Sequence, residues 1–153
     1  MASQPQQDWV KRVLGFVPHG AGAVDVRAVR AAVRAWREAS EAVDAQVSAL
    51  QAVLKASADP DLQEIADFGM VALSGGNRTR ILAAVAELEH ADPPPPELLK
   101  RTATIVAKCR AHFASDPKVR GFDSNPFGVK VSIRATLTPV LQQIEAAVTP
   151  RGT

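Results

Sequence analysis

The sequence predicts an all-α fold, an antiparallel bundle of about five helices, from its composition and one long periodic segment. Of its 153 residues, 27 are alanine, 5% are aromatic and none is tyrosine. Alanine is the strongest helix former, whereas strands favour aromatic and β-branched residues. A chain of this length buries enough surface to fold without a disulfide or a metal, and its single cysteine excludes a disulfide framework.

The clearest element is a helix expected over residues 26–58, which contain no glycine or proline. Apolar residues recur there in steps of three and four, interrupted once where Ser40 takes the apolar position. They are Val26, Val29, Val33, Trp36, Val43, Val47, Leu50 and Leu54. Such a helix spans about 50 Å. Other helices must therefore cover its apolar side, or a second copy of the chain pairs with it.

Three shorter helices are expected in the middle of the chain, over residues 60–74, 77–90 and 97–115. The first follows Asp59-Pro60, which combines an N-cap with a first-turn proline, and the second follows two glycines with Asn77 as its cap. Four prolines at 93–96 predict a stiff extended spacer before the third. Residues 118–125 are expected to be irregular or a single turn.

The last helix, expected to begin at Asn125-Pro126, carries two conflicting patterns. Residues 129–134 alternate apolar and polar side chains, which is typical of a strand. From Ile133 onward apolar residues return in steps of three and four, and a lone strand would leave its backbone groups without partners. A helix is therefore favoured, and Phe127 is expected to pack into the core. A kink is expected at Pro139, because proline removes one backbone hydrogen bond of the helix.

The chain is expected to divide near residue 24. Residues 1–24 predict a short amphipathic helix followed by a linker with proline and glycine, and residues 25–150 predict the bundle domain. The short helix gathers apolar side chains, including Trp9, Val13 and Phe16. It either packs over one end of the bundle or docks into another protein as a helix in a groove.

The formal net charge is +2, but charge is unevenly distributed along the chain. Residues 1–37 carry +4, residues 38–99 carry −8 and residues 100–153 carry +6. Two interpretations stay open. Either neighbouring helices neutralise one another, or an exposed polar face docks a charged partner.

No sequence motif supports catalysis. HExxH, CxxC, GxSxG, P-loop and GxGxxG patterns are all absent from the sequence. Cys109 has the spacing of a buried, inert thiol, and Glu87-x-x-His90 lacks the second such pair that a di-iron bundle requires. We therefore expect no enzyme, no cofactor and no metal site.

One candidate for binding a charged partner is an arginine stripe, formed by Arg27, Arg30, Arg34 and Arg37. These residues repeat in steps of three and four and so line one side of the long helix. Glutamates stand four residues after Arg34 and Arg37, as on an ordinary solvated helix, and few aromatic residues are present to stack on bases. Nucleic acid is therefore an alternative partner and not the expected one.

A second candidate lies at the turn before residue 77, where five residues could form an anion-binding cradle. They are Gly75, Gly76, Asn77, Arg78 and Arg80. Glycines before a helix free backbone N–H groups, and the helix dipole favours an anion there. The alternative is a capped turn with two solvated arginines.

The function expected from these observations is that of a non-enzymatic protein-interaction module, an adaptor or accessory part of a bacterial multicomponent system. The arginine stripe and the side chains of Trp9, Val13 and Phe16 are the expected contacts with another protein, and a homodimer is also possible. A polyanion or nucleic-acid binder and a small-ligand sensor remain alternatives. The sequence has no signal-peptide pattern and no apolar span, which predicts a cytoplasmic protein without a membrane partner and leaves leaderless secretion open.

Overall fold

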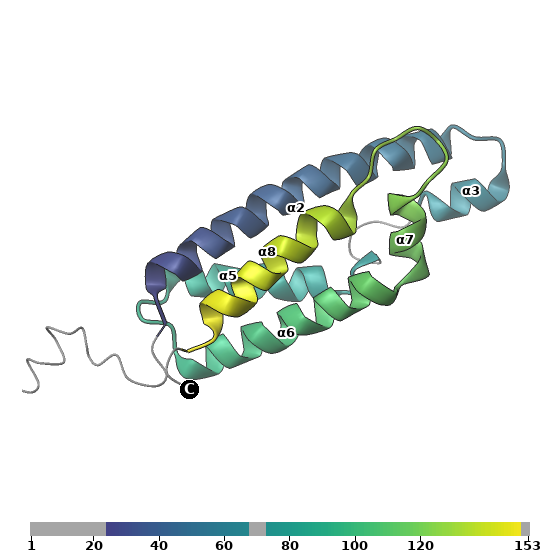
Figure 1. The fold of residues 1–153 in the computed structure, drawn as a ribbon. Helices are drawn as coiled ribbons and strands as arrows, with labels where there is room; N and C mark the ends of the chain where they lie inside the picture. Colours follow the sequence, from purple (N-terminus) through teal and green to yellow (C-terminus); the bar gives the residue numbers. More distant parts are fainter. Residues whose placement is uncertain (1–23, 68–72, 151–153) are drawn as a thin grey trace, which may run out of the picture.

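The computed structural model describes residues 24–67 and 73–150, and every regular element in these ranges is a helix (Figure 1). The elements are α2 (Val26–Lys55), α3 (Pro60–Ile65), α5 (Asn77–His90), α6 (Pro96–Ser115), α7 (Pro117–Asp123) and α8 (Ile133–Val148). The all-α prediction is confirmed.

Four longer helices form the bundle, and two short ones lie at one of its ends. α2 packs mainly on α8, α8 on α6, and α6 on α5, which also contacts α2. These neighbours run antiparallel, and α3 and α7 lie at the end of α2 that is opposite to Val24 (Figure 1). The long helix is therefore covered by other parts of the same chain along its apolar side.

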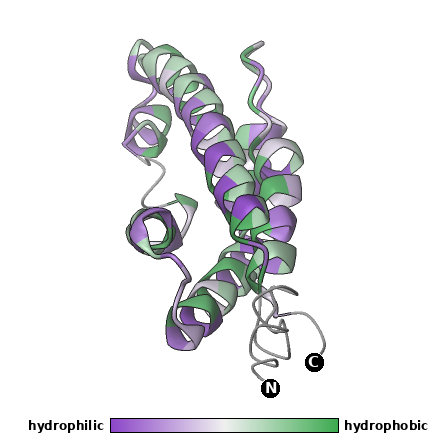
Figure 2. Cartoon of the chain, turned by 90° about the vertical axis from the view of Figure 1, so that its left-hand side faces the viewer, coloured by the Kyte–Doolittle hydropathy of each residue, from purple (hydrophilic) through white to green (hydrophobic). Residues whose placement is uncertain are grey.

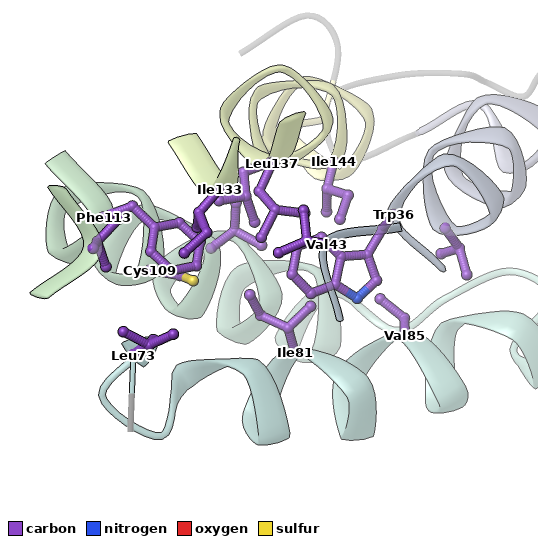
Figure 3. Close-up of a cluster of buried hydrophobic side chains, with 14 of the residues drawn as sticks. Trp36, Val43, Leu73, Ile81, Val85, Cys109, Phe113, Ile133, Leu137 and Ile144 are labelled. Carbon is purple, nitrogen blue, oxygen red and sulfur yellow. The ribbon is translucent and has the colours of Figure 1, made fainter. Parts of the chain in front are cut away.

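The core consists of the apolar positions that the periodic pattern predicts. On α2 the predicted row is buried at Val29, Val33, Trp36, Val43, Val47, Leu50 and Leu54, and Ser40, in the same row, is only 2% exposed, whereas Val26 at the start of the row is half-buried. Side chains from α2, α5, α6 and α8 meet around Trp36 and Phe113 (Figure 3). Each helix shows hydrophilic and hydrophobic sides along its turns, as amphipathic helices do (Figure 2).

Three expected boundaries in the first half of the chain are wrong. α2 ends at Lys55, three residues early, and the helix expected over 60–74 ends at Ile65. Asn77 is the first residue of α5 and not its cap, because Gly76 takes the cap position in the left-handed conformation with φ 80°. Glycine is favoured at such a φ because other residues meet a steric penalty there.

The last helix begins at Ile133 and not at Asn125-Pro126, so that prediction is wrong. Residues 124–132 are neither helix nor strand, whereas the region expected to be irregular or a single turn contains most of the seven-residue helix α7. Phe127 is 39% exposed and does not enter the core. Pro139 lies on the exposed side of α8, which continues through it as one helix.

Candidate functional site

An apolar groove lies at the end of the bundle where α2 ends and α3 and α7 meet. Its volume is about 300 Å³. The fully buried Leu50 and Leu54 of α2 form its floor. The rest of the lining comes from α3 (Leu62, Ile65), from α7 (Pro117, Lys118, Gly121, Phe122) and from the loop after α7 (Asn125, Pro126, Phe127). The groove thus forms where two stretches that are distant in sequence, residues 50–65 and 117–127, meet.

Helix α7 forms one wall of the groove. One side of the helix packs on the core, and another side lines the groove. Asp116 caps the helix by accepting a hydrogen bond from the Lys118 backbone N–H at 2.9 Å, and Val119 and Phe122 anchor it to the core. At Gly121 a Cβ atom would meet nothing within 4 Å. Glycine therefore leaves free space along this wall that a larger side chain would fill.

Asn125 fixes the rim of the groove. Its side-chain nitrogen donates to the carbonyl oxygens of Phe122 and Val129 at 2.8 and 2.9 Å, and its Oδ1 accepts from the Phe127 N–H at 3.0 Å. These three bonds hold the loop in one shape. As a result Phe127 stays at the groove with much of its ring in solvent, which is unfavourable for an aromatic side chain.

Acidic residues on α3 and just after it are neighbours in sequence of Leu62 and Ile65, which line the groove. Asp59 caps the helix, and its Oδ1 accepts from the Asp61 N–H at 2.9 Å. Asp61, Glu64 and Asp67 are exposed, and none of the three forms a salt bridge with another described residue. Within the described residues no salt bridge offsets the charge of these three carboxylates, which favours a cationic partner.

The arginine stripe lies on the outer side of α2, but contacts with α5 and the segment after it neutralise half of it. Arg37 donates to both carboxylate oxygens of Glu89, at 2.7 and 3.2 Å, and Arg30 lies 3.7 Å from Asp92. The other two arginines of the stripe, Arg27 and Arg34, are exposed and form no salt bridge with a described residue.

Arg78, expected in the anion cradle, makes its contacts inside the bundle. Its Nε donates to Ser40 Oγ at 3.0 Å, and its guanidinium pairs with the carboxylate of Asp44. The Arg78 side chain is only 20% exposed. This guanidinium therefore joins α5 to α2, and it explains the serine within the apolar row of α2.

The other residues of the expected cradle form a tight interhelical turn. Gly75 and Gly76 have φ values of 63° and 80°, and a Cβ atom at Gly75 would lie 3.1 Å from the His112 ring. Asn77 is 7% exposed, and its Oδ1 accepts from Arg80 at 3.2 Å. The structure thus brings these residues together, but the polar side chains of Asn77 and Arg78 form hydrogen bonds with Arg80 and with α2. Anion binding here stays a prediction.

The remaining predicted contact residues, Trp9, Val13 and Phe16, lie outside the described residues. Within residues 24–67 and 73–150 no group of three or more His, Cys, Asp or Glu side chains is placed to hold a metal ion. In the same ranges no helix combines the length and the apolar character that crossing a membrane requires.

Cys109 is fully buried on α6, and burial raises the pKa of its thiol from 9.0 to about 12. We expect no reaction with a disulfide reagent at pH 8 in the folded protein. We also expect the free energy of unfolding to fall as pH rises from 9 to 12, because the unfolded chain loses the thiol proton first. The slope from this group is about 1.4 kcal/mol per pH unit. Urea titrations over this pH range, compared with Cys109→Val, measure it, and equal slopes would contradict the prediction.

Sequence reasoning missed the groove, although one of its signals was visible. Asn125-Pro126-Phe127 was interpreted as a helix start, but asparagine followed by proline also marks turns. No protein-family model matches this sequence, and no curated protein or solved structure is significantly similar to it.

Proposed function

We propose that this chain is a non-enzymatic protein-interaction module whose apolar groove receives side chains of a partner protein. The observation that carries the proposal is the exposed ring of Phe127, held by Asn125 at the rim of a preformed apolar groove. A partner that covers this ring and fills the groove removes apolar surface from water. Each large apolar side chain buried in this way contributes about 1.5–3 kcal/mol.

The charges around the groove support a protein partner over a polyanion. The carboxylates of Asp61, Glu64 and Asp67, which form no salt bridge with another described residue, lie on and just after α3 and would repel phosphate groups. The arginine stripe, the alternative site for nucleic acid, is half neutralised by Glu89 and Asp92. An apolar segment that also carries basic side chains fits the groove better than either alternative.

The size of the groove favours one other candidate function, the binding of a small ligand. A volume of about 300 Å³ is at the lower end of the range for ligand sites. Such sites orient their ligands with a few convergent polar groups. Here the polar atoms of the Asn125 side chain are already bonded to the chain's own backbone. Protein docking is therefore the better-supported function.

The substitution Gly121→Leu tests the proposal because Gly121 lines the groove and a Cβ atom there would meet no other atom within 4 Å. We expect selection from a random peptide display library, with the full chain as target, to enrich peptides with aromatic or aliphatic anchors and a basic residue. Binding of these peptides to Gly121→Leu should weaken at least about tenfold, since one central pocket often dominates the binding energy. Fluorescence anisotropy of labelled peptides measures the change.

The matched control is Ala83→Leu, which adds the same side chain at an exposed position of α5 away from the groove. Its peptide binding should equal that of the unmodified chain. The thermal midpoint of Gly121→Leu should be unchanged or higher, because glycine is a poor helix former. Failure to enrich any groove-dependent peptide would contradict the proposed function.

A further inference from the structure

We infer that the groove is filled by residues 9–16 from a second copy of this chain, so that two copies exchange these segments. The inference rests on the proposed docking function of the groove, and it names the partner. Three observations support it. The first is the chemistry of residues 9–16, and the second is the distance between the groove and the start of α2. The third is that the groove and the start of α2 lie at opposite ends of the bundle.

Residues 9–16 have the composition that the groove selects. The segment contains five apolar side chains, with two basic residues between them. The apolar residues are Trp9, Val10, Val13, Leu14 and Phe16. The basic pair, Lys11 and Arg12, is opposite in charge to the exposed carboxylates of Asp61 and Glu64 on α3 and of Asp67 just after it. Apolar anchors and opposite charges therefore match on both sides of the contact.

The length of the connecting chain excludes a complete docking of this segment within one molecule. The floor of the groove begins at Leu50, 24 residues after Val26, which is about 36 Å along the helix axis. Phe16 precedes Val24 by eight residues, which reach at most about 28 Å when fully extended. Residues 9–16 can therefore enter the groove as a whole only from another copy.

The shape of the bundle makes a reciprocal exchange geometrically simple. α2 begins at Val26, and α3 and α7 lie at its opposite end (Figure 1). If two bundles lie side by side in opposite directions, each places the residues before Val24 next to the groove of the other. A two-fold axis then relates two identical contacts, and the assembly closes as a dimer.

Sedimentation velocity on the full chain over a range of concentrations tests this inference. We expect reversible dimerisation. The double substitution Trp9→Ala/Phe16→Ala, which alters the segment, and Gly121→Leu, which fills the groove, should each raise the dimer dissociation constant at least about tenfold. Ala83→Leu should leave it unchanged. Circular dichroism melts of all four proteins show whether a loss of association comes from unfolding instead.

A mixing experiment shows whether the contact is made between molecules. The double-substituted chain keeps an intact groove, and the Gly121→Leu chain keeps an intact segment. An equimolar mixture should therefore regain one of the two contacts and associate more strongly than either variant alone. If the segment acted on its own bundle, mixing would restore nothing, and that result would overturn the inference.

Failure of the inference and failure of the proposed function give different results. A chain that is monomeric at all concentrations overturns the exchange. If the groove still binds displayed peptides and loses them in Gly121→Leu, the docking function stands with a different protein as partner. A dimer that is insensitive to both the segment and the groove substitutions also overturns the exchange.

Discussion

Replacing Trp36 by alanine is expected to lower the free energy of unfolding by about 3–5 kcal/mol. Trp36 is completely buried, and its ring lies among side chains of α5 and α8, close to Ile81 and Val85 (Figure 3). Alanine would leave a large cavity in a packed interior that relaxes only in part. Urea denaturation followed by circular dichroism measures the loss.

Trp36→Phe is the informative control for this prediction. The indole Nε1 is buried, and it has no hydrogen-bond partner among the residues that the structure describes. A buried donor without a partner is destabilising, so its removal offsets part of the packing that phenylalanine loses. We therefore expect Trp36→Phe to cost less than half as much as Trp36→Ala. A cost for Trp36→Phe of more than half that for Trp36→Ala would contradict this prediction.

The substitution Asp123→Ala is expected to cost about 3 kcal/mol, because this one carboxylate holds the start of α8. Its Oδ1 accepts from the Ile133 N–H at 2.7 Å, and its Oδ2 accepts from the backbone N–H and the Nε of Arg134 at 3.2 and 3.0 Å. The Asp123 side chain is only 10% exposed. Loss of a helix cap together with charged hydrogen bonds gives an effect of this size.

Ser132→Ala tests whether Asp123 is the true cap of α8. Ser132 occupies the N-cap position, but its side chain makes no capping hydrogen bond and instead bonds to Gln46 and Thr136. We therefore expect Ser132→Ala to cost about 1 kcal/mol or less. The stability cost of Asp123→Asn should lie between those of Ser132→Ala and Asp123→Ala, because asparagine keeps one hydrogen-bond acceptor and loses the charge. Chemical denaturation of the three variants gives the order, and a reversed order would contradict this assignment.

The Asp123 contacts also show why the start of the last helix was not predictable from local sequence. Asn125-Pro126 is a valid local start signal, and nothing near Ile133 competes with it. The cap of α8 comes from α7, ten residues earlier in the chain. Sequence signals for a helix start use only neighbouring residues, whereas the start of α8 depends on how α7 and α8 meet in space.

Part of the candidate site was predictable and part was not. The capping pair Asp59-Pro60 predicted the start of α3, whereas α7, which begins after Asp116, lies in a region that was expected to be irregular or a single turn. The exposed position of Phe127 was not visible, because it depends on the hydrogen bonds of Asn125 to Phe122 and Val129. Arg78 likewise looked like a ligand for anions until its pairing with Asp44 on α2 was known.

The sequence by itself determined the helical class, the long α2 and the face that α2 buries. These follow from the spacing of apolar residues along one segment, which is a local property. Only the tertiary structure decided which arginines of α2 are neutralised, where α8 begins and that α2, α3, α7 and their loop enclose a groove. Each of these depends on contacts between residues far apart in the chain. Such contacts arise only when the helices pack, because burial of apolar surface drives packing without direction and side-chain geometry then selects the partners.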